Sequence, residues 1–236
     1  SLETSINYLL ALSFQGMTLG KIANEIYILM SQSINEISEK QTKGQVGSST
    51  MPHKVNPVII LQVIEEAAIL RGKASTTIEA GMPLHEGDLR YNKIVDNLIK
   101  DATVLSLKLS QKFNSMLNNL LINSKQMQRN LLNEKDYIAS ENLMYKLGKY
   151  LGRQEAHDLI HLIIKKSVKH KLSAKEQFLN DPIILKYFTT ADTEKILNPI
   201  KYIGESKKIS LKMSKFGIKK ATEIHARSTS KNLLIR

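Results

Sequence analysis

Residues 44–57 carry the side chains of this chain that are best suited to chemistry. They read Gly-Gln-Val-Gly-Ser-Ser-Thr-Met-Pro-His-Lys-Val-Asn-Pro. Glycines let backbone N–H groups turn toward an anion, and Lys54 can offset the charge of a carboxylate. The amide of Asn56 can donate to an oxyanion, and the hydroxyl of Ser48 or Ser49 is a strong base once it is deprotonated. From residue types alone, a polar loop with turn residues is the simpler interpretation.

The order of these residues, however, resembles a known motif. Residues 47–56 are similar at every defined position to G-S-S-x-M-P-x-K-x-N, the signature of the fumarase/aspartase superfamily. Met-Pro-His-Lys at 51–54 resembles the branch that holds adenylosuccinate lyase and carboxymuconate cycloisomerase. Residues 152–157 and 198–204 are similar to C-terminal segments of that branch. We therefore call residues 44–57 the signature segment.

The resemblance implies a β-elimination that usually releases fumarate. A base removes a proton from the carbon next to a carboxylate, and an acid protonates the departing group. By its place in the motif, Ser48 would be that base, while Lys54 and Asn56 would hold the substrate carboxylate and its developing charge. Further substrate contacts are expected from Ser49, Thr50 and Met51. The substrate would be a small anionic dicarboxylate, and neither a cofactor nor a metal is expected.

A second loop, at residues 81–88, is expected to contribute to the site. Adenylosuccinate lyases carry an arginine-bearing segment there. Here Gly87 replaces one arginine, and Arg90 can substitute for it. His53, His85 and Glu86 are expected to support the substrate-binding residues without touching the substrate themselves. A solvated charged loop accounts for the second loop equally well.

Two departures from the family pattern leave the substrate open. Many members carry Glu five residues after the motif Asn, whereas this chain has Leu61, as in the cycloisomerase branch. The general-acid His of the family lies in an N-terminal domain that these 236 residues lack. Adenylosuccinate lyase-like activity is the first hypothesis and carboxymuconate cycloisomerase-like activity the second. This stretch alone is expected to be inactive, or nearly so.

The elements that position these segments are predicted to be helices, so the fold class is all-α. Apolar residues at i, i+3 and i+4 predict long helices at about 2–39, 58–80 and 91–121. They form a long-helix bundle at 1–123, which carries the signature segment, followed by a compact helical C-terminal domain at 124–236. The resemblance implies a homotetramer that pools such helices and builds each active site from three subunits.

The C-terminal domain is predicted to consist of shorter helices. Their approximate bounds are 125–133, 137–150, 154–171, 174–180, 192–197 and 206–223. Ser173 and Glu176 have the spacing of a capping box at the start of one of them. No strand and no internal repeat is expected.

Composition limits the classes of protein that fit. The chain has a formal net charge of +12 and no cysteine, which excludes a disulfide scaffold and thiolate metal ligands. No run approaches the roughly 18 apolar residues of a membrane span, and no signal-peptide pattern is present. We expect no membrane contact and a cytoplasmic location.

Other candidate features are better explained without a specific function. After residue 200 the chain has ten Lys and Arg residues and only two acidic ones, which suggests a nucleic-acid-binding module. Few aromatic residues lie between these cations to stack on bases, so nucleic acid is an unlikely partner. A non-catalytic helical scaffold is a further alternative. His157 and His161 have zinc-pair spacing without a third ligand. Gly16-x-x-x-Gly20-Lys21 departs from a phosphate loop in spacing and lies within a helix.

Overall fold

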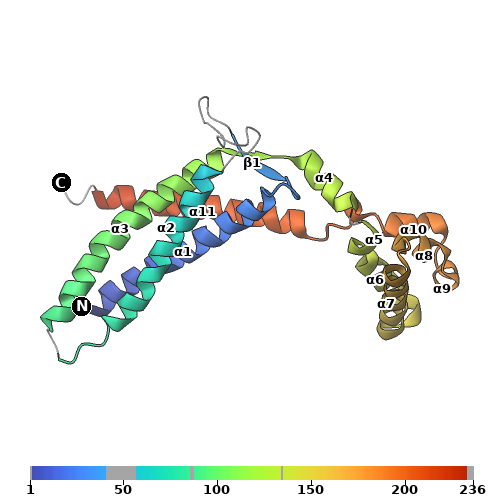
Figure 1. Cartoon of the computed structure of the whole chain (residues 1–236), viewed down its shortest axis with the longest axis horizontal. Coiled ribbons are helices and arrows are strands. Elements are labelled where there is room, and N and C mark those ends of the chain that lie inside the picture. Colours follow the sequence, from blue (N-terminus) through green and yellow to red (C-terminus); the bar gives the residue numbers. More distant parts are fainter. Residues whose placement is uncertain (1, 41–56, 86–87, 134, 233–236) are drawn as a thin grey trace. The chain divides into compact units, whose positions relative to one another are not determined.

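The computed structural model describes residues 2–40, 57–85, 88–133 and 135–232, and helices dominate it (Figure 1). The all-α prediction is therefore confirmed. The chain divides into two compact units, Ser1–Gln128 and Arg129–Arg236. The predicted boundary at residue 123 lies close to this division.

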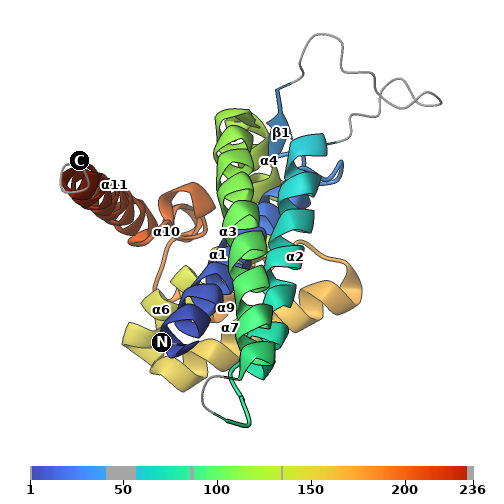
Figure 2. The same cartoon turned by 90° about the vertical axis from the view of Figure 1, so that its left-hand side faces the viewer.

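Three long helices form the first unit: α1 (Leu2–Leu29), α2 (Val58–Glu79) and α3 (Leu89–Asn118). They lie side by side, and each contacts the other two (Figure 2). The thirty residues of α3 correspond to a rod of about 45 Å. The predicted bundle helices at 58–80 and from about 91 onward are thus present.

The core of this unit follows the helical period. Buried residues recur every three or four positions, so that each helix turns one apolar stripe toward the other two. The fully or nearly fully buried members on α2 and α3 are Ile60, Val63, Ala67, Leu70, Val95, Leu98, Ala102, Leu109 and Met116. Burial of these side chains is the main contribution that holds the three helices together.

The predicted first helix is ten residues too long, and the expectation of no strand is wrong. Helix α1 ends at Leu29, the chain then turns, and Asn35 adopts a left-handed φ of 52° before the backbone becomes extended. Strand β1 (Ile37–Glu39) then pairs antiparallel with β2 (Leu120–Ile122), with Glu39 opposite Leu120. The last residues of the predicted third helix therefore also belong to a strand. The apolar pattern alone could not distinguish these outcomes, because three-residue strands show no period.

The second unit contains short helices around its own core. After α4 (Ser124–Asn133), which spans the division, they are α5 (Lys135–Ile138), α6 (Ser140–Leu151), α7 (Arg153–His170), α8 (Ala174–Asn180), α9 (Pro182–Leu185), α10 (Thr190–Ile196) and the 3₁₀ helix η1 (Pro199–Lys201). Buried Leu143, Leu147, Ile160, Phe178 and Ile184 hold them together.

Side-chain caps start several of these helices. Ser173 accepts a hydrogen bond from the N–H of Glu176 at the start of α8, as the predicted capping box requires. Helix α9 is absent from the predicted elements, although its start carries a cap as well. Asp181 accepts from the N–H groups of Ile183 and Ile184, and Pro182 occupies the first helical position.

The last helix, α11 (Ser206–Asn232), extends nine residues beyond its predicted end. Its side chains from 206 to 228 are exposed, apart from a half-buried Glu223. At 100° per residue, Ile209, Met213 and Phe216 lie on one side while Leu211 and Ile218 lie on another. The apolar side chains of α11 therefore form no single stripe, and the buried core of the second unit takes its residues from 143–197 instead.

Gly16 and Gly20 bring α1 into close contact with α2. A Cβ atom at Gly16 would lie 3.1 Å from the carbonyl oxygen of Ala67 and 3.2 Å from the Cβ of Leu70. Arg71 also donates from Nη1 to the carbonyl oxygen of Gly16, at 3.4 Å. The spacing of these glycines therefore serves helix packing rather than phosphate binding.

We predict opposite effects for two Gly→Ala changes in this bundle. Alanine favours a helix over glycine by about 1 kcal/mol. Gly72→Ala should show this gain, because no atom lies within 4 Å of the added Cβ. Gly16→Ala should lose it, because overpacking costs about 1–3 kcal/mol. Thermal midpoints at one protein concentration measure the difference, and an equal shift in both variants would contradict this packing.

Candidate active site

The signature segment lies outside the described residues except for Pro57. The predicted site residues outside them are Ser48, Ser49, Thr50, Met51, His53, Lys54, Asn56 and Glu86. The structure does describe the two flanks, which end at Lys40 and begin again at Pro57. These flanks show how the fold holds the segment at both ends.

Backbone pairing anchors the first flank. The N–H of Lys40 donates to the carbonyl oxygen of Asn119 at 2.8 Å, which continues the pairing of β1 with β2. The Lys40 ammonium also donates to the carbonyl oxygen of Asn118, at 3.1 Å. The chain therefore leaves the bundle from a fixed point beside the carboxyl end of α3.

A buried carboxylate ties this flank to the second one. Glu39 is 8% exposed, and its Oε1 accepts a hydrogen bond from the N–H of Ile60 at 3.0 Å. Ile60 is the third residue of α2, and Pro57 provides no side-chain cap for that helix. Glu39 thus satisfies one of the free N–H groups at the amino end of α2, where a negative charge is also favourable.

Glu39 is a positioning residue that the sequence did not reveal. The apolar pattern predicts the end of a long helix at this position, which gives an acidic side chain no special role. Its partner lies 21 positions away, beyond the signature segment. A cap of this kind has no local pattern, because ordinary caps come from the residue directly before the helix.

The second predicted loop shows a different arrangement. Asp88 caps α3 by accepting from the N–H of Arg90 at 3.1 Å. The guanidinium of Arg90 donates to both carboxylate oxygens of Asp88, from Nε at 3.0 Å and from Nη2 at 2.8 Å. These hydrogen bonds lower the pKa of Asp88 below its usual value and raise the pKa of Arg90. Arg90 is exposed but paired.

The described flanks of the two loops lie at opposite ends of α2 (Figure 1). The signature segment enters the amino end at Val58, whereas the second loop follows the carboxyl end at Glu79. Twenty-two helical residues span about 33 Å. Within one chain, Arg90 and the exposed His85 are therefore not brought to the described flanks of the signature segment.

The remaining candidates add no catalytic centre. The rings of His157 and His161 stack 6.0 Å apart, and His157 Nδ1 lies 3.0 Å from a carboxylate oxygen of Asp158. Hydrogen bonds from His157 and Gln154 lower the pKa of Asp158. No group of three metal-ligating side chains occurs in the part of the chain that the structure describes.

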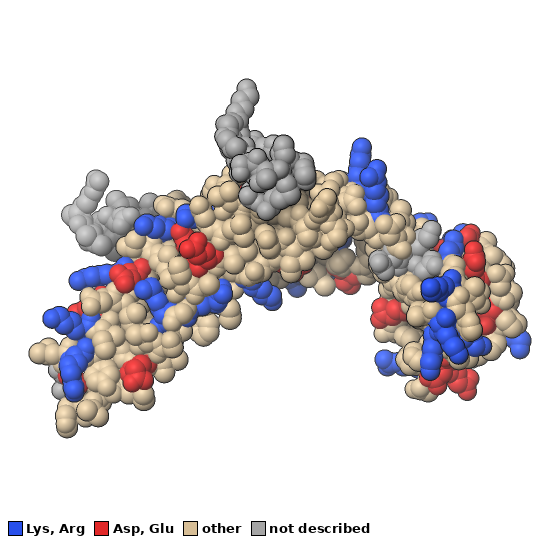
Figure 3. Space-filling model, in the orientation of Figure 1, with Lys and Arg blue, Asp and Glu red and all other residues tan. Residues whose placement is uncertain are grey.

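Charge is mixed on one face of the bundle. On the face that Figure 3 shows, Lys and Arg side chains alternate with Asp and Glu over the long helices. Intermixed charges of both signs do not form the continuous basic track that a nucleic-acid backbone favours. No helix among the described ranges is both long and apolar enough to cross a membrane.

Comparison with known families agrees with the predicted resemblance. A model described as lyase matches residues 2–72, and a model described as adenylosuccinate lyase C-terminus matches residues 136–212. This chain belongs to the fumarase/aspartase superfamily. The first match includes the signature segment, and the second includes both C-terminal segments on which the resemblance was based.

The relatives of this chain are named for different substrates. An N-acetyl-S-(2-succino)cysteine lyase of Dickeya dadantii is 31% identical over 189 residues, which are 80% of this chain and 42% of that protein. An adenylosuccinate lyase of Pyrococcus abyssi is 34% identical over 199 residues, 84% of this chain and 44% of that protein. The chain spans less than half the length of these relatives.

Two solved structures share the fold of this chain. The 3-carboxy-cis,cis-muconate lactonizing enzyme of Pseudomonas putida superposes with a TM-score of 0.72 at 25% identity, over 85% of this chain and 45% of that one. A fumarate lyase from Mesorhizobium sp. BNC1 has a TM-score of 0.73 at 22% identity, over 85% and 44%. The latter likeness supports the fold alone.

We predict that Glu39→Ala destabilises the protein and lowers its activity, whereas Glu39→Gln changes both much less. Alanine removes the acceptor for the Ile60 N–H at a cost of about 1–2 kcal/mol. Glutamine keeps an acceptor oxygen of the same reach. Thermal midpoints and kcat/KM of the whole protein measure the effects. Equal midpoints for the two variants would show that Glu39 does not cap α2.

Proposed function

We propose that the whole protein is a lyase that eliminates fumarate from a substrate carrying a succinyl group on nitrogen or sulfur. The observation that carries this proposal is the signature segment, with Ser48, Lys54 and Asn56 at its defined positions. The names of the adenylosuccinate and succinocysteine lyases, which are at least 30% identical to this chain, support the same class of substrate.

The proposed reaction needs a base, a stabiliser of negative charge and an acid. Ser48, as the alkoxide, takes a proton from the carbon next to one carboxylate of the succinyl group. The electron pair left on that carbon passes first into the carboxylate and gives an aci-carboxylate dianion. It then forms the carbon–carbon double bond of fumarate while the bond to nitrogen or sulfur breaks. The departing atom receives a proton from an acid outside these 236 residues.

Lys54 and Asn56 supply the charge stabilisation in this proposal. The aci-carboxylate carries one more negative charge than the carboxylate from which it forms, so a fixed ammonium and an amide donor stabilise the transition state more than the ground state. Ser49, Thr50 and Met51 would line the same substrate carboxylate. Loop movement that excludes water would strengthen these interactions, because charges attract more strongly in a dry site.

The substrate itself is a finer proposal. Adenylosuccinate is our first candidate, because several relatives carry that enzyme name and a model of its C-terminal part matches residues 136–212. N-acetyl-S-(2-succino)cysteine has the same succinyl half on a sulfur atom and is the second. A carboxymuconate is the alternative, since the lactonizing enzyme shares the fold at 25% identity. We expect the reaction to take place in the cytoplasm.

We further propose that each complete site draws on more than one copy of the chain, in a homotetramer. The support is geometric: the flanks of the signature segment and Arg90 lie at opposite ends of α2. The bundle also exposes large apolar side chains that a monomer would leave in water. Those with at least half of their surface exposed include Phe14, Met17, Ile28, Ile69, Val104 and Leu107.

We predict that Ser48→Ala in the whole protein lowers kcat by about 10²–10⁴-fold, because a positioned base contributes rate of that order. Absorbance changes with adenylosuccinate, with N-acetyl-S-(2-succino)cysteine and with 3-carboxymuconate would be recorded. Ser210→Ala on the exposed α11 is the matched control and should retain wild-type activity.

The outcomes of this assay separate the hypotheses. Full activity in Ser48→Ala would remove Ser48 from the role of base. Turnover of carboxymuconate alone would replace elimination by the cycloisomerase-like alternative. A protein that turns over none of the three substrates would favour the non-catalytic scaffold.

A mixing experiment tests whether sites are shared. Ser48→Ala and Arg90→Gln should each be nearly inactive, yet hybrids reassembled from equal amounts should regain up to about a quarter of wild-type activity, since random assembly restores some sites in which both residues are intact. Activity after co-refolding measures this recovery. Hybrids that stay as inactive as their parents would contradict a site that takes Ser48 and Arg90 from different copies.

A further inference from the structure

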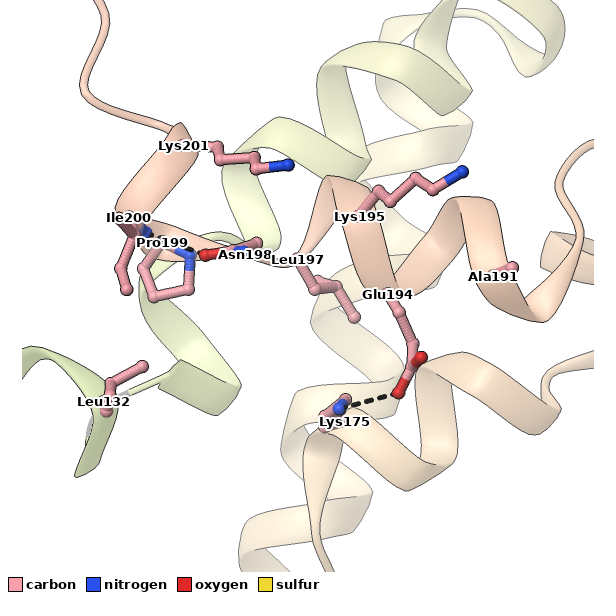
Figure 4. A pocket seen from close by; sticks show the side chains of 10 residues that line it. All are labelled: Leu132, Lys175, Ala191, Glu194, Lys195, Leu197, Asn198, Pro199, Ile200 and Lys201. Atoms are coloured by element: carbon pink, nitrogen blue, oxygen red, sulfur yellow. Dashed lines mark hydrogen bonds and ion pairs between the residues drawn. The ribbon is translucent and has the colours of Figure 1, made fainter.

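The C-terminal unit contains a cavity of about 470 Å³ that the proposed reaction does not use. Figure 4 shows its lining at close range. The side chains belong to Leu132, Lys175, Ala191, Glu194, Lys195, Leu197, Asn198, Pro199, Ile200 and Lys201. All of them lie in Arg129–Arg236, so this unit forms the cavity by itself. Its volume is in the range of small-molecule sites.

One part of the lining is apolar. Leu197 and Pro199 are buried, and Leu197 belongs to the core of the unit, so this part of the surface is fixed from behind. Leu132 and Ile200 extend that surface and remain exposed at 38% and 44%. A flat hydrocarbon or aromatic body that covers these side chains would remove them from water, which is favourable.

The other part of the lining is cationic. Three ammonium groups and one carboxylate line the cavity. The carboxylate of Glu194 pairs with Lys175 at 2.9 Å, and both side chains are partly exposed. Within the described ranges, Lys201 takes part in no ion pair; Lys195 forms none either, although its charge helps to lower the pKa of Asp192. The excess of positive charge calls for an anionic partner.

Asn198 adds a donor to these cations. Its Oδ1 accepts a hydrogen bond from the N–H of Ile200 at 3.1 Å and so starts η1. This bond fixes the orientation of the side chain. The Nδ2 group makes no hydrogen bond to another described residue and is able to donate to a bound oxygen.

We propose that this cavity binds a small organic anion, in which a carboxylate or phosphate is attached to a flat apolar body. The apolar body would lie over Leu197 and Pro199, and the anionic group would meet Lys175, Lys201 and the Asn198 amide. Lysine ammonium groups act as point charges without a preferred fork geometry, so they accept either anion. This site goes beyond the proposed elimination and does not depend on it.

The charge of Glu194 makes the proposal predict a specific direction of change in anion affinity. An ion pair at this degree of exposure is weak, so an arriving anion is able to compete with Glu194 for Lys175. Removing the Glu194 charge should therefore tighten binding of the anion, whereas removing a lysine charge should weaken it. A purely apolar ligand would respond to neither change.

The test is ligand-observed ¹⁹F NMR with the whole protein. The probes are 4-fluorobenzoate, 4-fluorophenyl phosphate and the neutral 4-fluorobenzamide. Both anions should bind, and whichever binds more tightly identifies the preferred anionic group. The neutral amide should bind at least about threefold more weakly, which is the scale of one exposed ionic contact.

Variants then assign the binding to this cavity. Lys201→Gln should raise the dissociation constant of the preferred anion about three- to fivefold, and Glu194→Gln should lower it. Lys186→Gln is the matched control, because it removes the same charge from an exposed residue of the same unit outside the cavity lining. Unchanged thermal midpoints would verify that all three variants fold.

Three results would overturn the proposal. The first is that the amide and the anions bind with equal dissociation constants. The second is that Lys201→Gln and Lys186→Gln change the dissociation constant of the anion equally. The third is that Glu194→Gln binds the anion more weakly than the wild type does. Because the readout is binding and not turnover, each of them leaves the proposed lyase reaction standing. Loss of Ser48-dependent activity, in turn, would leave this cavity unaffected.

Discussion

The hydrogen bond from the Ile60 N–H to the buried Glu39 carboxylate joins the two flanks of the signature segment. It connects the end of β1 to the start of α2, and the pairing of β1 with β2 links both to the end of α3. Four elements of the first unit thus meet where the chain enters and leaves the signature segment. The acid–base chemistry that we propose for this segment needs ends held in this way, because catalysis depends on positions fixed to fractions of an ångström.

The length of α2 imposes a second constraint. A straight helix of 22 residues keeps Pro57, before it, far from the described part of the loop after it. Arg90 is meanwhile held by Asp88 through two donor contacts. A site that uses both ends of the bundle would therefore need antiparallel helices from other copies, and the exposed apolar side chains of the bundle provide a surface for such packing.

The C-terminal unit has a different physical character. Its short helices are started by side-chain caps and enclose a small core of their own, which leaves lysines and one glutamate around a concave apolar surface. In the bundle, by contrast, glycines allow α1 and α2 to approach so closely that little space remains between them.

The sequence by itself determined the helical class, the approximate bounds of α2 and α3, the capping box at Ser173 and the residues of the signature segment, because helical periodicity and a contiguous motif are local properties. Only the tertiary structure decided that residues 37–39 form a strand, that Glu39 caps α2 from 21 positions away, and that Gly16 serves close packing. Each of these depends on a partner distant in the chain, and no local pattern encodes such a partner. The separation of Arg90 from the flanks of the signature segment is different, since it follows from the length of α2, which the sequence predicted.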